Sequence, residues 1–300
     1  MKMLKKTKYI ALFTLISTQV YAVENGVVAF PVGVHSVLNG LTTQPGENRV
    51  YNYTAFASAN RINDSDGNKL PVKFKAQIAI EALRLDHGWE TRLADFTLSS
   101  GIVATMLNTS ITVGNQESNK FGMGNFTIKP IIFGLVNESG TLHQVFSPLD
   151  LVIPTGSYDK DRLANPGFHY YSWQPSYGYT WFPSTNIEVS GTVSAAINSK
   201  NKETDYKSGA TVHLEQMIGY SISPTIQLGL QGYYYDQLSD DKLDGQVFLD
   251  GNRSRAAAIG PQIRYSPKPG VAMALKYQRD VIAENQSQGG KLWFQFSFPF

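Results

Sequence analysis

The sequence predicts an all-β protein, a transmembrane antiparallel up-and-down β-barrel of about 12 strands. Three observations predict this fold. Apolar and polar residues alternate along most of the chain, several alternating stretches exceed ten residues, and the chain ends in an aromatic strand, Lys291 to Phe300. About 9–11 tilted residues cross a bilayer as a strand, so these stretches are long enough to span one.

The first 22 residues have the three parts of a secretory signal peptide. Four lysines form a basic start, Ile10 to Ile16 form a short apolar core, and Val20-Tyr21-Ala22 ends on a small residue suited to cleavage. We expect cleavage after Ala22, with an uncleaved membrane anchor as the alternative. Export by this route and a barrel fold together predict a location in the outer membrane of a Gram-negative bacterium.

Residues 23–48 do not alternate clearly and are rich in glycine and proline. Their position before the first strand predicts an N-terminal segment that folds into the lumen as a plug. A loosely ordered periplasmic extension is the alternative. Residues 49–300 are expected to form the transmembrane β-barrel.

Within the barrel region, Ile187 to Ile197 shows the alternation most clearly, because its odd positions are apolar or small and its even positions are mostly polar. Short connections such as Pro183-Ser184 and Ile222-Ser223-Pro224 predict periplasmic turns, and longer ones near 157–167, 199–205, 238–252 and 283–289 predict extracellular loops. The strands are expected at approximately 49–60, 72–87, 97–113, 123–136, 141–155, 168–182, 185–199, 206–222, 224–237, 253–267, 270–282 and 290–300.

The last strand is expected to close the barrel. Its apolar residues share one face, while Gln295 and Ser297 lie on the other. Pairing with the first strand, near 49–60, would leave no free edge. Phe296, Phe298 and Phe300 resemble the C-terminal signal by which such barrels are recognised for insertion, so we expect the barrel-assembly machinery as a partner.

A soluble β-sandwich also shows alternation and is the competing fold. Sandwich strands average about 5–6 residues, which is shorter than several of the stretches found here. Aromatic residues also gather near the ends of the expected strands, as in the girdles at the two interfaces of a membrane barrel. The sequence therefore favours the barrel.

The composition limits the chemistry. The chain has 26 Lys and Arg against 24 Asp and Glu, and four of those lysines lie in the signal peptide. The remaining chain has a formal charge of −2, which argues against a nucleic-acid partner. With no cysteine and no histidine pair at metal-ligand spacing, we expect no metal and no cofactor. No His-x-Ser pair of the kind found in outer-membrane phospholipase A occurs, so we expect no enzyme activity.

Polar residues opposite the apolar faces are predicted to line the lumen. A charge that faces lipid costs about 2–4 kcal/mol for Arg or Lys near the midplane, which favours the inner face. The functional interpretation is a polar path or binding site, and the structural one is a salt-bridged network that fills the barrel. The candidates are Lys73, Lys75, Gln77, Glu81, Lys129, Asp150, Glu188, His213, Glu215, Arg264 and Lys276.

Short motifs in a fixed order complete the analysis. They are Phe30-Pro31-Val32-Gly33, Gly122-Met123-Gly124-Asn125, Pro154 to Asp159, Asn165-Pro166-Gly167 and Gly232 to Gln237. In these motifs the chain resembles the SphA-like outer-membrane proteins of the meta-pathway of phenol degradation family. It departs from the family at Asn125, where Asp is expected, and at Phe30, where Tyr is usual.

The resemblance implies a porin-like barrel that takes up hydrophobic or aromatic small molecules. We therefore expect an outer-membrane channel or transporter for such compounds, associated with an aromatic degradation pathway. A non-transporting structural or adhesive barrel is the alternative. The expected partners are outer-membrane lipid, the assembly machinery and a small hydrophobic or aromatic solute.

Overall fold

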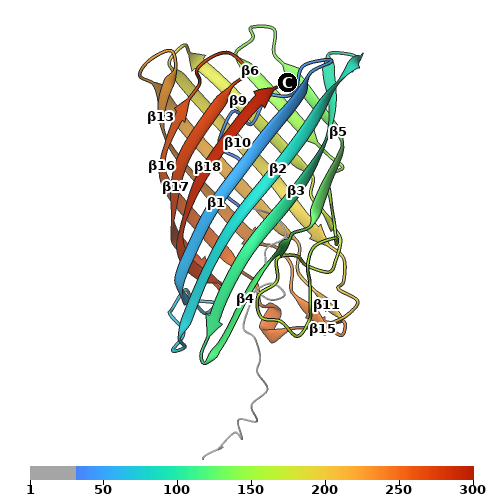
Figure 1. Cartoon of the computed structure of the whole chain (residues 1–300), viewed down its shortest axis with the longest axis vertical. Helices are drawn as coiled ribbons and strands as arrows, with labels where there is room; N and C mark the ends of the chain where they lie inside the picture. The colour runs from blue at the N-terminus through green and yellow to red at the C-terminus, as the bar shows by residue number, and fades with distance from the viewer. Residues whose placement is uncertain (1–31) are drawn as a thin grey trace, which may run out of the picture.

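The computed structural model describes residues 32–300, so the predicted signal peptide (1–22) and the start of the predicted plug lie outside the described residues. These residues form a closed antiparallel barrel whose wall is crossed 12 times (Figure 1). The predicted fold class is confirmed. No helix among residues 32–300 is both long enough and apolar enough to cross a membrane.

Nine crossings are single strands: β1 (Asn48–Ile62), β2 (Phe74–Leu93), β3 (Phe96–Val113), β10 (Ile187–Asn198), β12 (Thr211–Ser221), β13 (Ile226–Gln237), β16 (Arg255–Tyr265), β17 (Ala272–Glu284) and β18 (Ser287–Pro299). Three are each made of two strands: β4 (Gln116–Met123) with β5 (Phe126–Val136), β6 (Leu142–Ser147) with β7 (Leu151–Ile153), and β8 (Ser172–Trp173) with β9 (Ser176–Ser184). A small separate sheet contains β11 (Tyr206–Lys207), β14 (Lys242–Leu243) and β15 (Gln246–Val247), next to the short helix η2 (Leu249–Gly251).

The three interrupted crossings correct the sequence prediction, which has continuous strands at 123–136, 141–155 and 168–182. It also places residues 116–122, which belong to β4, between two strands. Pro148 lies between β6 and β7, and Pro175 lies between β8 and β9. Proline has no N–H for the strand ladder, so pairing breaks there. At the third interruption, between β4 and β5, the Asn125 side chain accepts a hydrogen bond from the Gly156 N–H at 3.0 Å and donates one to the Phe168 carbonyl at 2.9 Å.

The barrel closes where β1 pairs with β18, from Arg49 opposite Pro299 to Ile62 opposite Ser287. This is the predicted pairing of the first and last strands. Phe300 extends it, because its N–H donates to the carbonyl of Asn48 at 2.9 Å. Each of the 12 crossings is therefore paired with neighbours on both sides for at least part of its length, as a membrane barrel requires, although β4 itself pairs with β3 alone.

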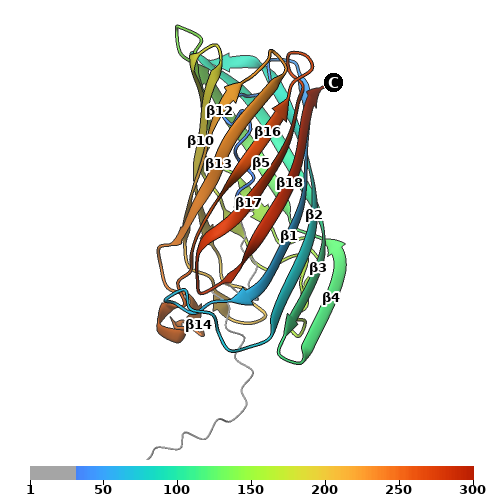
Figure 2. The same cartoon turned by 90° about the vertical axis from the view of Figure 1, so that its left-hand side faces the viewer.

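The two ends of the barrel differ in their connections. The end near Phe300 carries compact turns such as 94–95, 185–186 and 222–225, and we call it the tight-turn end. The opposite, long-loop end carries 63–73, 154–171, 199–210 and 238–254, and the small sheet with η2 lies there (Figure 2). The predicted loop at 283–289 is wrong. β17 and β18 are joined there by two residues, and Asn285 adopts the left-handed conformation (φ 49°) that Asn tolerates.

The wall is apolar outside and mostly polar inside. On β18, Leu292, Phe294 and Phe298 are exposed, whereas Trp293 and Gln295 point inward and are buried. The inner wall of β2 and β3 at the long-loop end is the exception. There Phe74, Ala76 and Ile111 pack against Leu163 and Ala164 of loop 154–171, so this loop folds into the lumen.

Candidate functional site

Residues 32–47 lie inside the barrel and lead into β1; we call them the lumen segment (Figure 2). Three inward side chains of β17 and β18 bind its backbone carbonyls. Lys276 Nζ donates to Val34 O at 2.8 Å, Gln295 Nε2 donates to the same oxygen at 2.9 Å, and Gln278 Nε2 donates to Gly33 O at 3.0 Å. The lumen segment is therefore held chiefly through its main chain.

A second set of contacts carries the lumen segment to the opposite wall. The N–H of His35 donates to Glu215 of β12 at 2.6 Å, and the N–H of Gly40 donates to Thr180 of β9 at 2.9 Å. A Cβ atom at Gly40 would overlap backbone atoms of His143 and Thr180, so only glycine fits at this approach. The segment thus crosses the lumen and touches both sides of it.

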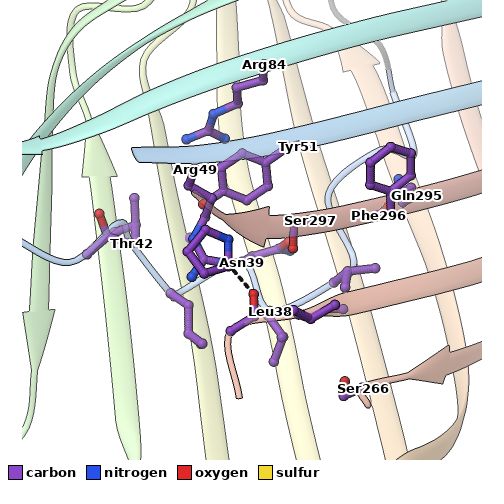
Figure 3. A pocket seen from close by; sticks show the side chains of 18 of the residues that line it. Leu38, Asn39, Thr42, Arg49, Tyr51, Arg84, Ser266, Gln295, Phe296 and Ser297 are labelled. Atoms are coloured by element: carbon purple, nitrogen blue, oxygen red, sulfur yellow. Dashed lines mark hydrogen bonds between the residues drawn. The ribbon is translucent and has the colours of Figure 1, made fainter. Parts of the chain in front are cut away.

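Between the lumen segment and the wall lies a chamber of about 840 Å³, which we call the tight-turn chamber (Figure 3). This volume falls within the range of about 300–1,000 Å³ that is usual for small-molecule sites. Residues of the turns at the tight-turn end, including Pro224 and Pro267, form its rim. The other lining residues include Leu38, Asn39, Thr42, Arg49, Tyr51, Tyr53, Arg84, Lys129 and Ile132.

Four cations line the tight-turn chamber. An acid neutralises three of them, and the fourth, Lys268, is an exposed residue of the turn 266–271 at the rim. Arg84 forms an ion pair with Asp86, Lys129 with Asp150, and Arg49 with Glu47, the last at 2.8 Å. The guanidinium carbon of Arg84 also lies 4.7 Å from the centre of the Tyr51 ring. The Tyr51 and Tyr53 rings are parallel, with centres 6.4 Å apart. The chamber therefore presents aromatic and apolar surface with little unpaired charge.

Seven of the predicted lumen residues lie on inner faces. They are Lys129, Asp150, Glu188, His213, Glu215, Arg264 and Lys276. Arg264 and Glu188 form a buried ion pair between β16 and β10, while Glu215 and Lys276 bind the lumen segment. Ser194 and His213 pair across β10 and β12 with 3.4 Å between Oγ and Nδ1, a contact that no His-x-Ser spacing in the sequence reveals. Of the seven, only Lys129 lines the tight-turn chamber.

The prediction is wrong for Lys73, Lys75, Gln77 and Glu81. Lys75, Gln77 and Glu81 lie on the outer side of β2, and Lys73 is exposed in the loop directly before it. The inner side carries Ala76, which pairs with Ile111 and packs on Leu163. Alternation separates two faces but does not say which is inside, and the apolar loop 154–171 makes an apolar inner wall favourable here. The two lysines are at the long-loop end of the strand, where outward charges reach water or lipid headgroups.

Sequence reasoning missed Arg49, Tyr51, Tyr53 and Arg84. A signal for them was present on β2, because Arg84 and Asp86 continue the face of Ala76, Ile78, Ile80 and Ala82. Two charges at its end mark that face as the inner one. Tyr51 pairs with Arg84, which places the tyrosines on the same side.

At the long-loop end, Asp241 holds the small sheet to β12 and β13. The Gly209 N–H and Gln237 Nε2 donate to one carboxylate oxygen, both at 2.7 Å, and Tyr206 Oη and Asn252 Nδ2 donate to the other, at 2.5 and 3.0 Å. Burial disfavours the charged form and raises the pKa of Asp241 from 3.8 to about 6, although the four donors act in the opposite direction. We call β11, β14, β15 and η2 the long-loop cap.

The stability of the long-loop cap is therefore expected to depend on pH. Because the folded pKa of Asp241 lies above the unfolded value, this group stabilises most below about pH 4, and the contribution is lost as pH rises through about 6. The change is on the order of 3 kcal/mol. Amide hydrogen exchange of residues 206–209 and 241–252, corrected for intrinsic rates, should be slower at pH 5 than at pH 7.5. Asp241→Asn should exchange faster at both pH values and show no such difference.

Comparison with known proteins identifies the family of this chain. The profile of the family described as "Putative MetA-pathway of phenol degradation" matches residues 59–296. The chain belongs to this family. No curated protein matches the chain. Among solved structures, the chain is similar to the COG4313 outer membrane channel from Pseudomonas putida F1, with 17% sequence identity and a TM-score of 0.75. The match covers 88% of the present chain and 98% of the channel.

A second solved structure shares the fold more loosely. The β domain of the Bordetella autotransporter BrkA matches with 11% identity and a TM-score of 0.52, over 86% of the phenol-degradation family chain and all of that one. At these identities the likeness shows the fold. The family chain is therefore a barrel of the outer-membrane type.

Proposed function

We propose that the protein is an outer-membrane channel that takes up small hydrophobic or aromatic compounds and holds them in the tight-turn chamber on the way in. The tight-turn end faces the periplasm in this proposal, since short turns lie there in barrels of this class. A cleaved signal peptide, residues 1–22, directs export, and the barrel-assembly machinery recognises the aromatic C-terminal strand. The protein does no chemistry on its cargo.

The tight-turn chamber is the observation that carries this proposal. The chamber is lined by two tyrosine rings and by apolar side chains, in a volume suited to a small molecule. The chain that contains it belongs to a family associated with phenol degradation. Three of its four cations are already paired with Asp86, Asp150 and Glu47, and the fourth, Lys268, lies exposed at the rim. Uncharged aromatic compounds therefore lose less on entering than ions do, because little unpaired charge inside the chamber is available to replace the hydration of an ion.

The lumen segment and loop 154–171 control the path in this proposal. Both occupy the lumen, so a solute passes only if one of them moves aside. The segment, predicted to be part of a plug at 23–48, is held in the barrel by hydrogen bonds. They join it to seven wall strands: β2, β3, β9, β12, β16, β17 and β18. Such polar contacts are suited to reversible opening.

A bulky substitution that fills the tight-turn chamber tests the proposal. Val145 lines it, whereas Val189 is an outward residue of β10 that pairs with Trp181. In a deletion strain complemented with Val145→Trp, uptake of labelled aromatic compounds should fall several-fold, while Val189→Trp should support uptake like the unsubstituted chain. Equal uptake by the deletion strain and the complemented strain, for every hydrophobic and aromatic compound tried, would contradict the proposal.

The packing of the lumen favours a second candidate, a barrel that transports nothing and serves a structural or adhesive role. Conductance across planar bilayers separates the two. A sealed barrel gives neither ion current nor uptake, and a channel gives at least one of them. Release of fatty acids from phospholipid by the purified barrel would instead indicate a hydrolase.

A further inference from the structure

Two charged side chains face outward from the middle of wall strands. Glu81 is on the outer side of β2, opposite Thr54 on β1 and the exposed Met106 on β3. Arg279 is on the outer side of β17, two residues from the exposed Tyr277 and opposite the exposed Ile259. The other outward charges on these strands and on β16, such as Lys75, Glu284 and Arg255, lie at or near strand ends.

Both charges lack a counter-ion within residues 32–300. Glu81 accepts hydrogen bonds from Asn52 Nδ2 and from Thr54 Oγ1, the latter at 2.6 Å, and both donors are neutral. Neither Glu81 nor Arg279 takes part in any of the ion pairs of the described chain. Lipid offers no partner for a charge within the apolar band, so both groups gain if another protein surface covers them.

The two charges lie at the same depth in the membrane. A row of paired residues leads from Arg279 through Gly290 and Ser58 to Gln77. This row covers three strand spacings, about 14 Å, and Glu81 is four residues further along β2, about 13 Å. The line from Arg279 to Glu81 therefore lies about 43° from the row. Because strands in these barrels tilt by about 35–45° from the membrane normal, the row is inclined to the membrane plane by the same angle, and the line runs parallel to that plane.

The wall between them is apolar and broad. β17, β18, β1 and β2 lie side by side on the face that Figure 1 views down the shortest axis of the molecule. Phe56 and Leu292 pair at the centre of this face, with 58% and 42% of their surfaces exposed. The face thus has an apolar centre with one negative and one positive group at its two sides.

We infer that this face binds a second copy of the chain, side by side in the membrane, with Glu81 of each copy against Arg279 of the other. A two-fold axis along the membrane normal, passing in front of Phe56 and Leu292, brings the positive side of one copy to the negative side of its partner. The same rotation forms both ion pairs at once. A single patch is therefore complementary to itself, which is the condition for a symmetric dimer.

A charge-reversal experiment tests this arrangement. Glu81→Arg alone and Arg279→Glu alone each place like charges opposite one another, and each should raise the dissociation constant in lipid nanodiscs at least tenfold. The double variant Glu81→Arg/Arg279→Glu should associate like the unsubstituted chain. Mixing the two single variants under different tags should give pairs that contain one of each. Lys75→Glu, on the same wall at the strand end, is the matched control and should leave association unchanged.

Cross-linking in native membranes tests the geometry without altering the charges. The chain has no cysteine, so single thiols can be placed freely. Leu83→Cys and Tyr277→Cys, in differently tagged copies, sit one outward position from Glu81 and Arg279 and should be joined by a flexible bis-methanethiosulfonate. Glu81→Gln should reduce this product several-fold. Val193→Cys, exposed on β10, should give only background.

Specific outcomes would overturn the inference. One is a correctly folded, heat-modifiable barrel that is monomeric in nanodiscs and gives no cross-link above the Val193→Cys level. Another is failure of the mixed single variants to pair although both fold. If Arg279→Glu only reduces co-purified lipopolysaccharide and leaves association unchanged, Arg279 is a lipid contact and the dimer is wrong.

Discussion

Removal of residues 32–46, with the upstream chain joined directly to Glu47, is expected to raise single-channel conductance at least several-fold. The lumen segment crosses the barrel from β17 and β18 to β9, and its removal frees that cross-section for water and ions. Planar-bilayer recordings of the refolded barrel measure this directly. The wall is expected to persist, because its strand ladder does not include the segment.

A milder pair of variants checks that binding of the lumen segment, and not general loosening, controls the current. Lys276→Met/Gln295→Leu removes both donors to the Val34 carbonyl and should increase the frequency of open events. Gln144→Leu, which removes an outward glutamine bonded to Tyr177, should record like the unsubstituted barrel. Unchanged conductance after removal of residues 32–46 would show that loop 154–171 alone limits the current.

Glu188→Leu is expected to have the largest effect on stability. Glu188 is fully buried, pairs with Arg264, and accepts further hydrogen bonds from Ser190 at 2.7 Å and Gln227 at 3.0 Å. Its removal leaves the Arg264 guanidinium buried without its carboxylate, which costs about 3–5 kcal/mol. The measurement is the free energy of unfolding by urea in lipid vesicles, under conditions in which the unfolding and refolding curves coincide.

The double variant Glu188→Leu/Arg264→Met is the control for that loss. Replacing both charges by apolar groups of similar size removes the unpaired ion, so most of the stability should return. A loss in the double variant as large as in Glu188→Leu would mean that packing around β10, and not the ion pair, sets the cost.

The sequence was sufficient for the wall of this barrel because its signals are local. Alternation at Ile187 to Ile197 needs only the outward side to be apolar, and the final aromatic strand needs only to meet β1. The strand interruptions at Pro148 and Pro175 were visible as prolines but were outweighed by the length of the alternating stretches around them.

The candidate site was harder to predict because it depends on which residues meet across the lumen. Lys73, Gln77 and Glu81 were assigned inward on the assumption that lipid always takes the apolar face. Leu163 and Ala164 make an apolar inner face favourable here, because they pack against Ile111 inside the barrel. They lie 50 or more residues from Ile111 in the sequence, so no local pattern contains this information. Tyr51 and Tyr53 of the tight-turn chamber lie in the predicted strand 49–60, where tyrosine is expected for its β-propensity alone. Nothing in the local pattern therefore marks them as site residues.

The threading of residues 32–47 through the barrel also constrains the order of assembly. The segment is continuous with β1, and β1 closes the barrel at a seam by pairing with β18 from the other end of the sequence. Closing that seam first would leave a sealed cylinder that the segment has to enter lengthwise through the rim. Assembly avoids this step if the Val34 carbonyl binds Lys276 and Gln295 while the wall is still open. β1 and β18 then pair around a lumen that already contains the segment. Kinetic traps in the biogenesis of this protein are then expected at the seam, as empty barrels closed too early.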